Sequence, residues 1–493
     1  MEKTEVIGFG ELFDKIANIY EAGRVVRIEP VDMRNAILSL HFLSTANCQR
    51  FNDRNVVLPA GCFGSELMEN LKAIPAEKVC STIDKALEAI ENENFTPIER
   101  KSHPLTNISF GELESKYGTD ILVESIRMII DVISDKNHNT LINDYAYQIF
   151  ADLVEDFSKQ FPEAALYTTP HDIIAVMRQL VWARREIEQQ LPIRKTYDPA
   201  CGVGYTLAQC GGGEIYGQEL NEVTYTLANM AMLLDGRRGH ISLGDSLNSP
   251  KFWSEISRSE FDVAVSTPPL FLSGWRKTDA YDDMYEWGVP SDHHCEWAFT
   301  SQMLSSVNRE NGMVCTICSA GALFRAGGEQ IIREKVFEDN LVDAIVKLPY
   351  KSLYYTAIQI YIVVFRKGRK QNDGVLYLDL STQYRRSKKR NVLTLDQNID
   401  IQSIYADFLE GKEVAVEGVV KVVKYADLKA ELNKGNRLYL LQPFLPQEQE
   451  KPTYEKTKAE LEQELENLAK RLNECNEKIS KELKWLTDNR DNS

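Results

Sequence analysis

The chain has 493 residues, of which 43% are hydrophobic, and a formal net charge of −16. This length is several times that of a typical domain, so we expect two or three domains with cores of their own. The acidic balance disfavours a protein that grips nucleic acid unaided, so a DNA substrate would require a partner subunit to supply much of the contact.

The sequence predicts neither a membrane segment nor a targeting signal. No stretch approaches the roughly 18 uninterrupted apolar residues of a membrane span. The first residues, MEKTEVIGFGELFDKI, include acidic side chains and no long apolar core. We therefore expect a cytoplasmic protein that makes no membrane contact.

The pattern of hydrophobic residues changes three times along the chain. Residues 1–160 carry helical periodicity, as in ILVESIRMIIDVISD, and predict a helical N-terminal domain. Residues 161–370 alternate short apolar strands with helices, which predicts an α/β domain with a doubly wound parallel sheet. Residues 371–450 form a mixed segment that completes this domain, and residues 451–493 are helical again.

The helical tail carries an apolar seam on an otherwise charged sequence. Its members recur at spacings of three and four: Leu461, Leu465, Leu468, Leu472, Cys475, Ile479, Leu483 and Leu486. This spacing is typical of a coiled coil or of a helix in a bundle. We expect the tail to make an intersubunit contact, with an internal bundle helix as the alternative.

A loop of small residues at 196–209, TYDPACGVGYTLAQ, is the first candidate site. The strand before the loop places Asp198 at its tip. The small residues Ala200, Gly202 and Gly204 allow a ligand to approach the backbone at the N-terminus of the next helix. Taken alone, such a loop would equally fit a dinucleotide site.

The next strand tips also end in residues of the kind that bind ligands. IYGQEL places Glu219 where a carboxylate can accept both hydroxyls of a ribose, and ISLGDSL places Asp245 where it suits the edge of an adenine ring. The fourth strand, FDVAVS, runs into STPPL. An ordered set of four such tips predicts one ligand site on the rim of the sheet.

With these motifs the chain resembles the amino-group DNA methyltransferases, and most closely the methylation subunit of type I restriction–modification systems, with the gamma-type motif order. DPACGVG resembles the family's S-adenosylmethionine loop, GQELNEVTYTLANMAMLLDG its acidic strand and following helix, and GDSL its adenine-edge segment. The resemblance implies a Rossmann-like methyltransferase domain that uses S-adenosylmethionine. The cofactor residues that it implies in these motifs are Asp198, Ala200, Cys201, Gly202, Gly204, Glu219 and Asp245.

An upstream segment, LYTTPHDIIAVM, is similar to the family's Phe-Tyr-Thr-Pro segment, which packs on the methionine end of the cofactor. The resemblance therefore adds Tyr167, Thr168, Thr169 and Pro170 to the cofactor residues. From the residues alone, Thr169 can cap a helix that starts at Pro170 and leave free amides for a carboxylate, although a plain capped helix has the same pattern.

The prolines after the fourth strand mark the catalytic position of the family, where the pattern is Asn-Pro-Pro-Phe. The Asn and first Pro carbonyls of that pattern accept both hydrogens of the adenine amino group, and the ring stacks on the flipped base. Here Thr267 and Leu270 replace the Asn and the ring, whereas Pro268 and Pro269 remain. Losing one acceptor costs roughly 3–4 kcal/mol, and losing the ring costs roughly 1–3 kcal/mol; Phe271 lies one residue beyond the ring position.

Two groups of possible metal ligands do not form a convincing site. Cys315 and Cys318 lie in an apolar strand-like run without a second pair, so we expect buried thiols. His293, His294 and Cys295 lack a further ligand at a suitable spacing, so we expect an exposed loop cluster and no bound metal.

The densest basic run is YRRSKKRN, Tyr384–Asn391, and FRKGRK at residues 365–370 adds further cations. Contact with DNA phosphates and a solvated loop are both open for these segments.

Three functions fit the sequence. The first is a type I-like adenine-N6 DNA methyltransferase subunit. It would act with a specificity subunit, and a restriction subunit could join them, in a hetero-oligomer that uses the C-terminal helix. The second is a catalytically impaired S-adenosylmethionine-binding scaffold or sensor of a related phage-defence complex, which the changed residues Thr267 and Leu270 favour. The third, a methyltransferase for glutamine or RNA, has no evident use for the helical N-terminal region or the terminal seam.

Overall fold

The structure is a computed structural model with two units, residues 1–443 and residues 444–493. It describes residues 14–16, 18–19, 28–45, 56–134, 145–160, 166, 168–187, 193–237, 239–278, 280–370, 374–433, 440–444, 463, 465–467 and 470. The apolar seam predicted in the tail therefore lies almost entirely outside the described residues. Leu465, its one described member, is helical and 71% exposed.

The described residues up to position 160 form helices and no strand. They are α2 (Pro30–Thr45), α4 (Gly64–Ala73), α5 (Ala76–Asn94), the short 3₁₀ helix η1 (Glu99–Ser102), α6 (Phe110–Tyr117), α7 (Thr119–Ile133) and α9 (Ala146–Gln160). In α7 the apolar residues Leu122, Ile126, Ile129 and Ile133 recur every three or four positions and are all buried, as expected for one face of a packed helix. Helix α2 packs against α4, α7 and α9 and forms the centre of this layer.

Nine of the strands in the described part of the chain form one sheet, and two more form a separate hairpin. The nine are β1 (Lys195–Asp198), β2 (Glu214–Glu219), β3 (His240–Leu243), β4 (Val263–Ser266), β5 (Met313–Ser319), β6 (Val342–Lys347), β7 (Ile360–Arg366), β8 (Val375–Asp379) and β11 (Val420–Val423). Their order is β11-β8-β6-β7-β5-β4-β1-β2-β3. The chain builds outward from β1 to β3, then returns to place β4 on the other side of β1. Parallel strands flank this switch point, so the loops after β1 and β4 meet at one edge of the sheet, where α/β sheets bind ligands.

The expectation of a parallel sheet is wrong at β7 and at β11. Strand β7 runs antiparallel to both β5 and β6, and β11 runs antiparallel to β8. A parallel connection needs a crossover, usually a helix. The segment between β6 and β7, residues 348–359, contains no helix, so β7 returns beside β6 in the opposite direction. Strand β5, at the centre of the sheet, is buried at every position and holds Cys315 and Cys318 as buried free thiols.

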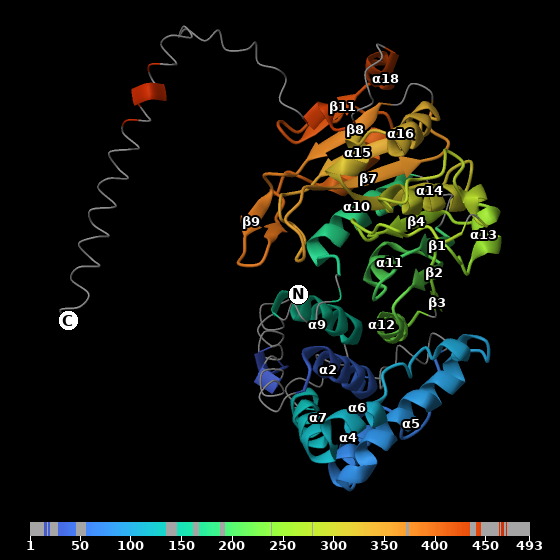
Figure 1. The fold of residues 1–493 in the computed structure, drawn as a ribbon, viewed down its shortest axis with the longest axis vertical. Coiled ribbons are helices and arrows are strands. Elements are labelled where there is room, and N and C mark those ends of the chain that lie inside the picture. Colours follow the sequence, from blue (N-terminus) through green and yellow to red (C-terminus); the bar gives the residue numbers. More distant parts are fainter. Residues whose placement is uncertain are drawn as a thin grey trace. The chain divides into compact units, whose positions relative to one another are not determined.

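Helices cover both faces of the sheet (Figure 1). The principal ones are α10 (His171–Ile187), α11 (Tyr205–Cys210), α12 (Glu222–Leu234), α14 (Glu296–Ser306), α16 (Gly328–Glu338) and α17 (Ile401–Leu409). Every side chain of α12 from Thr224 to Leu234 is buried, because β2 and β3 contact it on one side and α2 and α9 on another. A helix that is covered on all sides needs no polar face. Helix α12 packs between the N-terminal helices and the sheet and so joins them. Within the described part of the chain, no helix is long and apolar enough to cross a membrane.

Candidate functional site

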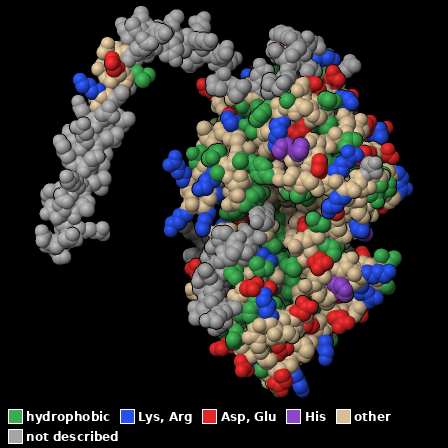
Figure 2. All heavy atoms as spheres, viewed as in Figure 1, with side chains coloured by type: hydrophobic (Ala, Val, Ile, Leu, Met, Phe, Trp, Pro, Cys, Tyr) green, Lys and Arg blue, Asp and Glu red, His purple; other side chains and the backbone are tan. Residues whose placement is uncertain are grey.

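A cavity of about 1110 Å³ opens beside the tips of β1 to β4 and is closed on another side by residues of α2 and α9. Figure 2 shows hydrophobic side chains around the central hollow of this face. The lining includes eleven of the residues predicted from sequence: Thr168, Thr169, Ala200, Cys201, Gly202, Glu219, Asp245, Thr267, Pro268, Pro269 and Leu270. Three other predicted residues, Pro170, Asp198 and Gly204, are not part of the lining. Tyr167 lies outside the described residues.

The loop after β1 needs its two glycines for different reasons. Gly202 has φ +54°, and a Cβ there would meet no atom within 4 Å, so backbone conformation requires the glycine and its surface faces open space. Gly204 has φ +77°, and a Cβ there would lie 2.9 Å from Met232 Cε of α12. Gly204 therefore allows the loop to pack against the helix, whereas Gly202 leaves room for a ligand.

Asp198 shapes this loop from inside. Its side chain is 1% exposed, and its carboxylate accepts a hydrogen bond from Ala200 N–H at 2.9 Å. Burial raises the pKa of Asp198 to about 7, although the Ala200 hydrogen bond opposes the shift. Asp198 is therefore a buried support of the loop, and the cavity is lined by the residues that follow it.

Asp198→Asn is expected to change how stability depends on pH. The parent carboxyl ionises near pH 4 in the unfolded chain but near pH 7 when folded, so the parent loses stability as pH rises between these values. The loss amounts to at most about 4 kcal/mol. The Asn side chain still accepts from Ala200 and cannot ionise, so at pH 8 the variant should be more stable than the parent, with the advantage vanishing below pH 4.

Denaturant unfolding from pH 4 to pH 8 measures this difference. The matched control is Asp120→Asn, which changes an exposed carboxylate in the first turn of α7. An Asp198→Asn variant that tracks the parent at every pH would contradict the assignment of a buried, protonated carboxyl.

Glu219, at the end of β2, connects the loop after β1 to the rim of the cavity through hydrogen bonds. Its Oε2 accepts Gly202 N–H at 3.0 Å, and its Oε1 accepts Asn221 N–H at 2.8 Å. Burial raises the pKa of Glu219, and these backbone hydrogen bonds limit the rise. A carboxylate can accept about four hydrogen bonds in all, so Glu219 retains acceptor capacity for a ligand hydroxyl beside its backbone partners. The geometry suits a diol such as a ribose.

Asp245, beyond β3, already accepts several hydrogen bonds. Its Oδ1 accepts Leu247 N–H and Asn248 N–H, each at 3.2 Å. Its Oδ2 accepts Asn248 Nδ2–H at 2.9 Å and pairs with the exposed Lys277 at 3.2 Å. Lys277 is the most exposed of these donors, so it is the one that a ligand amino group at this edge would displace.

The Thr-Pro-Pro-Leu segment follows β4 directly. Thr267 lies at the cavity, and its hydroxyl has no hydrogen-bond partner among the described residues. The carbonyl of Pro269 accepts from Cys295 Sγ at 3.0 Å. Cys295 is fully buried, so the expectation of an exposed His293–Cys295 cluster is wrong at this residue. In the described residues, no group of three or more His, Cys, Asp and Glu side chains could hold a metal ion.

The two aromatic residues that line the cavity with exposed rings are not at the family's ring position. Leu270 is 4% exposed and packs with the core, although part of it borders the cavity. Phe271 is 57% exposed and Tyr355, before β7, is 41% exposed; both line the cavity. Phe271 was the sequence-based alternative for the ring. Nothing in the sequence pointed to Tyr355, because an aromatic residue in a loop carries no periodic signal.

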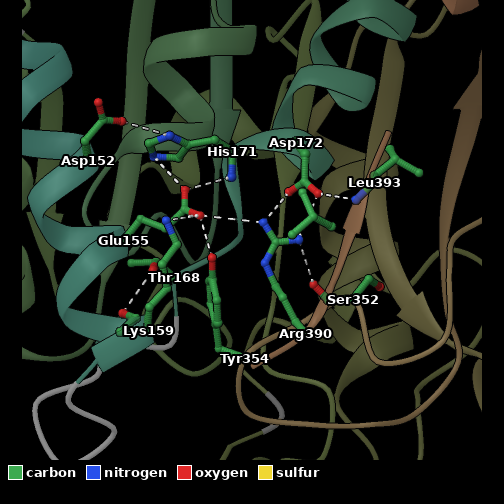
Figure 3. Close-up of polar contacts among 12 residues, drawn as sticks. Asp152, Glu155, Lys159, Thr168, His171, Asp172, Ser352, Tyr354, Arg390 and Leu393 are labelled. Atoms are coloured by element: carbon green, nitrogen blue, oxygen red, sulfur yellow. Dashed lines mark hydrogen bonds and ion pairs between the residues drawn. The ribbon is translucent and has the colours of Figure 1, made fainter. Parts of the chain in front are cut away.

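A polar network surrounds the N-terminus of α10 (Figure 3). Glu155 of α9 accepts His171 N–H at 3.1 Å, contacts the His171 ring at 3.1 Å and accepts Tyr354 O–H at 2.5 Å. Burial alone would raise the pKa of Glu155, but His171, Lys159 and the Tyr354 hydroxyl lower it to about 2. The negative charge of Glu155 is therefore stable across the physiological range, and the carboxylate borders the cavity.

This network differs from the capped helix expected at Thr169. Helix α10 begins at His171, and among the described residues the Thr169 hydroxyl caps none of its amides. Glu155 takes the first amide instead, and Asp172 binds Arg390 through two 2.8 Å hydrogen bonds. The carboxylate of Glu155 thus occupies the position at the helix N-terminus where the sequence pattern allowed a ligand carboxylate.

The charged lining favours a ligand that carries positive charge. Glu155, Glu219 and Asp245 contribute carboxylates, against Arg34 and Lys277 as cations and the His171 ring, which contacts Glu155. The open surface at Gly202, the diol-accepting oxygens of Glu219 and this acidic lining together fit the ribose, ammonium and sulfonium groups of S-adenosylmethionine.

Comparison with known proteins identifies the family of the chain. Residues 143–439, more than half of the chain, match the family model described as N-6 DNA Methylase. The type I restriction enzyme MjaVII methylase subunit of Methanocaldococcus jannaschii is 26% identical over 402 residues, covering 76% of this chain and 63% of that protein. The MpnII methylase subunit of Mycoplasma pneumoniae is 30% identical over 250 residues, covering 46% of this chain and 45% of that protein.

The matched part of the chain thus spans less than two thirds of either relative. Among solved structures, a type I restriction–modification methyltransferase subunit from Streptococcus thermophilus superposes with a TM-score of 0.68 at 16% identity, covering 87% of this chain and 98% of that one. This match confirms the predicted α/β methyltransferase fold, and the family match confirms the resemblance on which the cofactor residues were assigned. The chain belongs to the N-6 DNA Methylase family.

Proposed function

We propose that the chain is the methyl-transferring subunit of a type I restriction–modification-like system. It binds S-adenosylmethionine in the cavity and methylates adenine N6 in DNA together with a specificity subunit. The observation that carries this proposal is the placement of the Gly202–Glu219 pair and the Thr267-Pro268-Pro269 turn on the lining of one cavity. The residues proposed to bind the cofactor and those proposed to accept hydrogen bonds from the target amino group therefore line the same cavity.

The residues of the chain would divide the work as follows. Glu219 would accept the ribose hydroxyls, and Asp245 would accept from the adenine edge of the cofactor, whose sulfonium supplies the methyl group. At the β4 tip, the Thr267 hydroxyl and the Pro268 carbonyl would accept the hydrogens of the target amino group and hold its nitrogen for in-line attack. Phe271 and Tyr355 would stack on the extruded base and exclude water.

A second function is favoured by one observation. Thr267 offers a shorter and less fixed acceptor than an Asn amide, and Leu270 is packed in the core. A subunit with an intact cofactor loop and a weak amino-acceptor site could serve as a cofactor-binding scaffold or sensor of a defence complex. Methyl transfer by the assembled complex separates the two functions.

The proposed partners are a specificity subunit, DNA and a restriction subunit. An acidic chain benefits from a partner that supplies positive charge toward DNA. The apolar seam of residues 451–493 would dock this partner, and co-purification of a chain ending at residue 450 tests that contact: retained partner would contradict it.

The proposal is tested by calorimetric titration with S-adenosylmethionine. Glu219→Ala removes two acceptors for ribose hydroxyls, each worth roughly 1.5–3 kcal/mol when charged, so the affinity should fall at least tenfold. Glu222→Ala, an exposed carboxylate in the first turn of α12 and outside the lining, is the matched control and should bind as the parent does. A parent without affinity, or a Glu219→Ala variant of parental affinity, would remove the cofactor assignment.

A further inference from the structure

A short ribbon projects from the body of the protein beside α10 (Figure 1). It is the hairpin of β9 (Tyr384–Arg386) and β10 (Asn391–Leu393), which pair antiparallel. A hydrogen bond from Ser387 N–H to the Arg390 carbonyl, at 3.1 Å, closes the turn, so Lys388 and Lys389 stand at the tip. We name residues 384–393 the basic hairpin.

The basic hairpin carries four exposed cations: Arg385, Arg386, Lys388 and Lys389. In the described part of the chain, none of these four side chains has a hydrogen bond or an ion pair. Figure 2 shows a group of Lys and Arg side chains at the left edge, at the height where Figure 1 draws the hairpin. Elsewhere exposed cations do find carboxylates, as Lys412 does with Asp407 and Glu410. Four unpaired cations on one ribbon of a chain with net charge −16 indicate an anionic partner.

The second strand of the hairpin, from the turn residue Arg390 to Leu393, is anchored to α10 and to the segment before β7. Arg390 is 4% exposed, binds both oxygens of Asp172 at 2.8 Å and lies 4.9 Å from the ring centroid of Tyr354 (Figure 3). Leu393 N–H also donates to Asp172, at 2.6 Å, and Asn391 Nδ2 donates to the carbonyl of Tyr350 at 2.7 Å.

These contacts fix the exposed cations relative to the cavity. Asp172 is the second residue of α10, next to His171, which lines the cavity. A ribbon with one strand anchored presents its charges at a constant place and loses little entropy when it binds. The arrangement differs from that of a solvated loop, which would need no buried anchor.

We propose that the basic hairpin contacts the phosphate backbone of duplex DNA beside the cavity, with Arg385, Arg386, Lys388 and Lys389 as the contacting cations. This inference rests on the proposed function in taking DNA as the partner. A two-stranded ribbon of this kind reads no base from its charges alone. The hairpin therefore supplies sequence-independent grip, while the specificity partner supplies recognition.

The test is the salt dependence of duplex binding by the full chain assembled with its partner subunit. The variant Arg385→Gln/Arg386→Gln/Lys388→Gln/Lys389→Gln removes four cations and leaves the buried Arg390 in place. The matched control Lys78→Gln/Lys85→Gln/Lys101→Gln/Lys424→Gln removes the same charge from exposed positions outside the cavity lining and the hairpin. Fluorescence anisotropy with a labelled duplex is recorded between about 50 and 200 mM salt.

The hairpin variant should bind at least tenfold more weakly, and its slope of log affinity against log salt should be shallower by about 2–4, at roughly 0.9 per lost phosphate contact. The control should keep the parental slope. An unchanged slope in the hairpin variant, or an equal loss in the control, would overturn the inference.

Calorimetry with S-adenosylmethionine on the same preparations separates the inference from the proposed function. If the parent complex binds both DNA and cofactor while the hairpin variant keeps the parental slope, only the role of the hairpin is overturned. A parent complex that does not bind DNA overturns the proposed DNA substrate, and the hairpin inference with it.

Discussion

Thr267→Asn is expected to raise single-turnover methyl transfer to adenine by one to two orders of magnitude. The Thr267 hydroxyl has no partner among the described residues and lies on the cavity lining. An Asn carbonyl at the same position reaches further and has a fixed direction, and one well-placed transition-state acceptor contributes about 10²–10³ in rate. The measurement is the single-turnover rate of the assembled complex on DNA that carries its recognition site.

The matched control for this gain is Ser273→Asn. Ser273 is exposed, lies six residues further along the same loop region and is not part of the cavity lining, so its substitution should leave the rate unchanged. Cofactor affinity should be the same in all three proteins, because the loop after β1 and Glu219 are separate from the β4 tip. A fast parent would show that another group already acts as the acceptor. A complex that shows no methyl transfer even with Thr267→Asn would favour the scaffold function.

The structure argues against restoring the ring at residue 270 together with the amide. Leu270 is 4% exposed and packs among core residues, and adding atoms to a packed core costs about 1–3 kcal/mol. Phe271 already exposes its ring at the cavity. The single change at Thr267 is therefore the cleaner test of activity.

Arg390→Ala is expected to destabilise the protein by about 3–5 kcal/mol, the usual cost of removing one partner from a buried ion pair. Burial alone would lower the pKa of Arg390, but its hydrogen bonds with Asp172 raise it, so the guanidinium is charged. Removing it leaves Asp172 and Glu155, 2.8 and 3.6 Å from the guanidinium, without its compensating charge. Urea denaturation at neutral pH measures the loss.

Lys389→Ala is the matched control, because it removes a neighbouring cation that is exposed and unpaired among the described residues. Its free energy of unfolding should stay within about 0.5 kcal/mol of the parent value. In a second background, Asp172→Asn, the loss of unfolding free energy caused by Arg390→Ala should be smaller, because residue 172 then carries no charge that Arg390 must compensate. Equal stabilities for Arg390→Ala and Lys389→Ala would contradict the anchoring role of Arg390.

The sequence predicted the parts of the site that depend on consecutive residues. The loop with Gly202 and the carboxylate of Glu219 each follow a short apolar run, and parallel neighbouring strands place such tips together. The fold class follows from the same alternation of strands and helices. The direction of β7 was missed because the apolar pattern of a strand is the same in either direction.

The contacts across the cavity could not be predicted in this way. Arg390 and Asp172 are 218 residues apart, and no local pattern relates them. Glu155 lies in a helix whose apolar spacing predicts only which face is buried, not that a carboxylate on it meets His171. Leu270 and Phe271 are adjacent in a turn, where no periodicity decides which side chain faces the core.

The most direct test of the central claim is to locate the methyl group after transfer. The assembled complex is incubated with labelled S-adenosylmethionine and DNA that carries its recognition site, and the nucleosides are separated and identified by mass spectrometry. We predict label on N6-methyladenine, accumulating faster with Thr267→Asn and lost with Glu219→Ala. A complex that binds cofactor and DNA yet leaves every adenine unlabelled, in the parent and in Thr267→Asn alike, would contradict the claim.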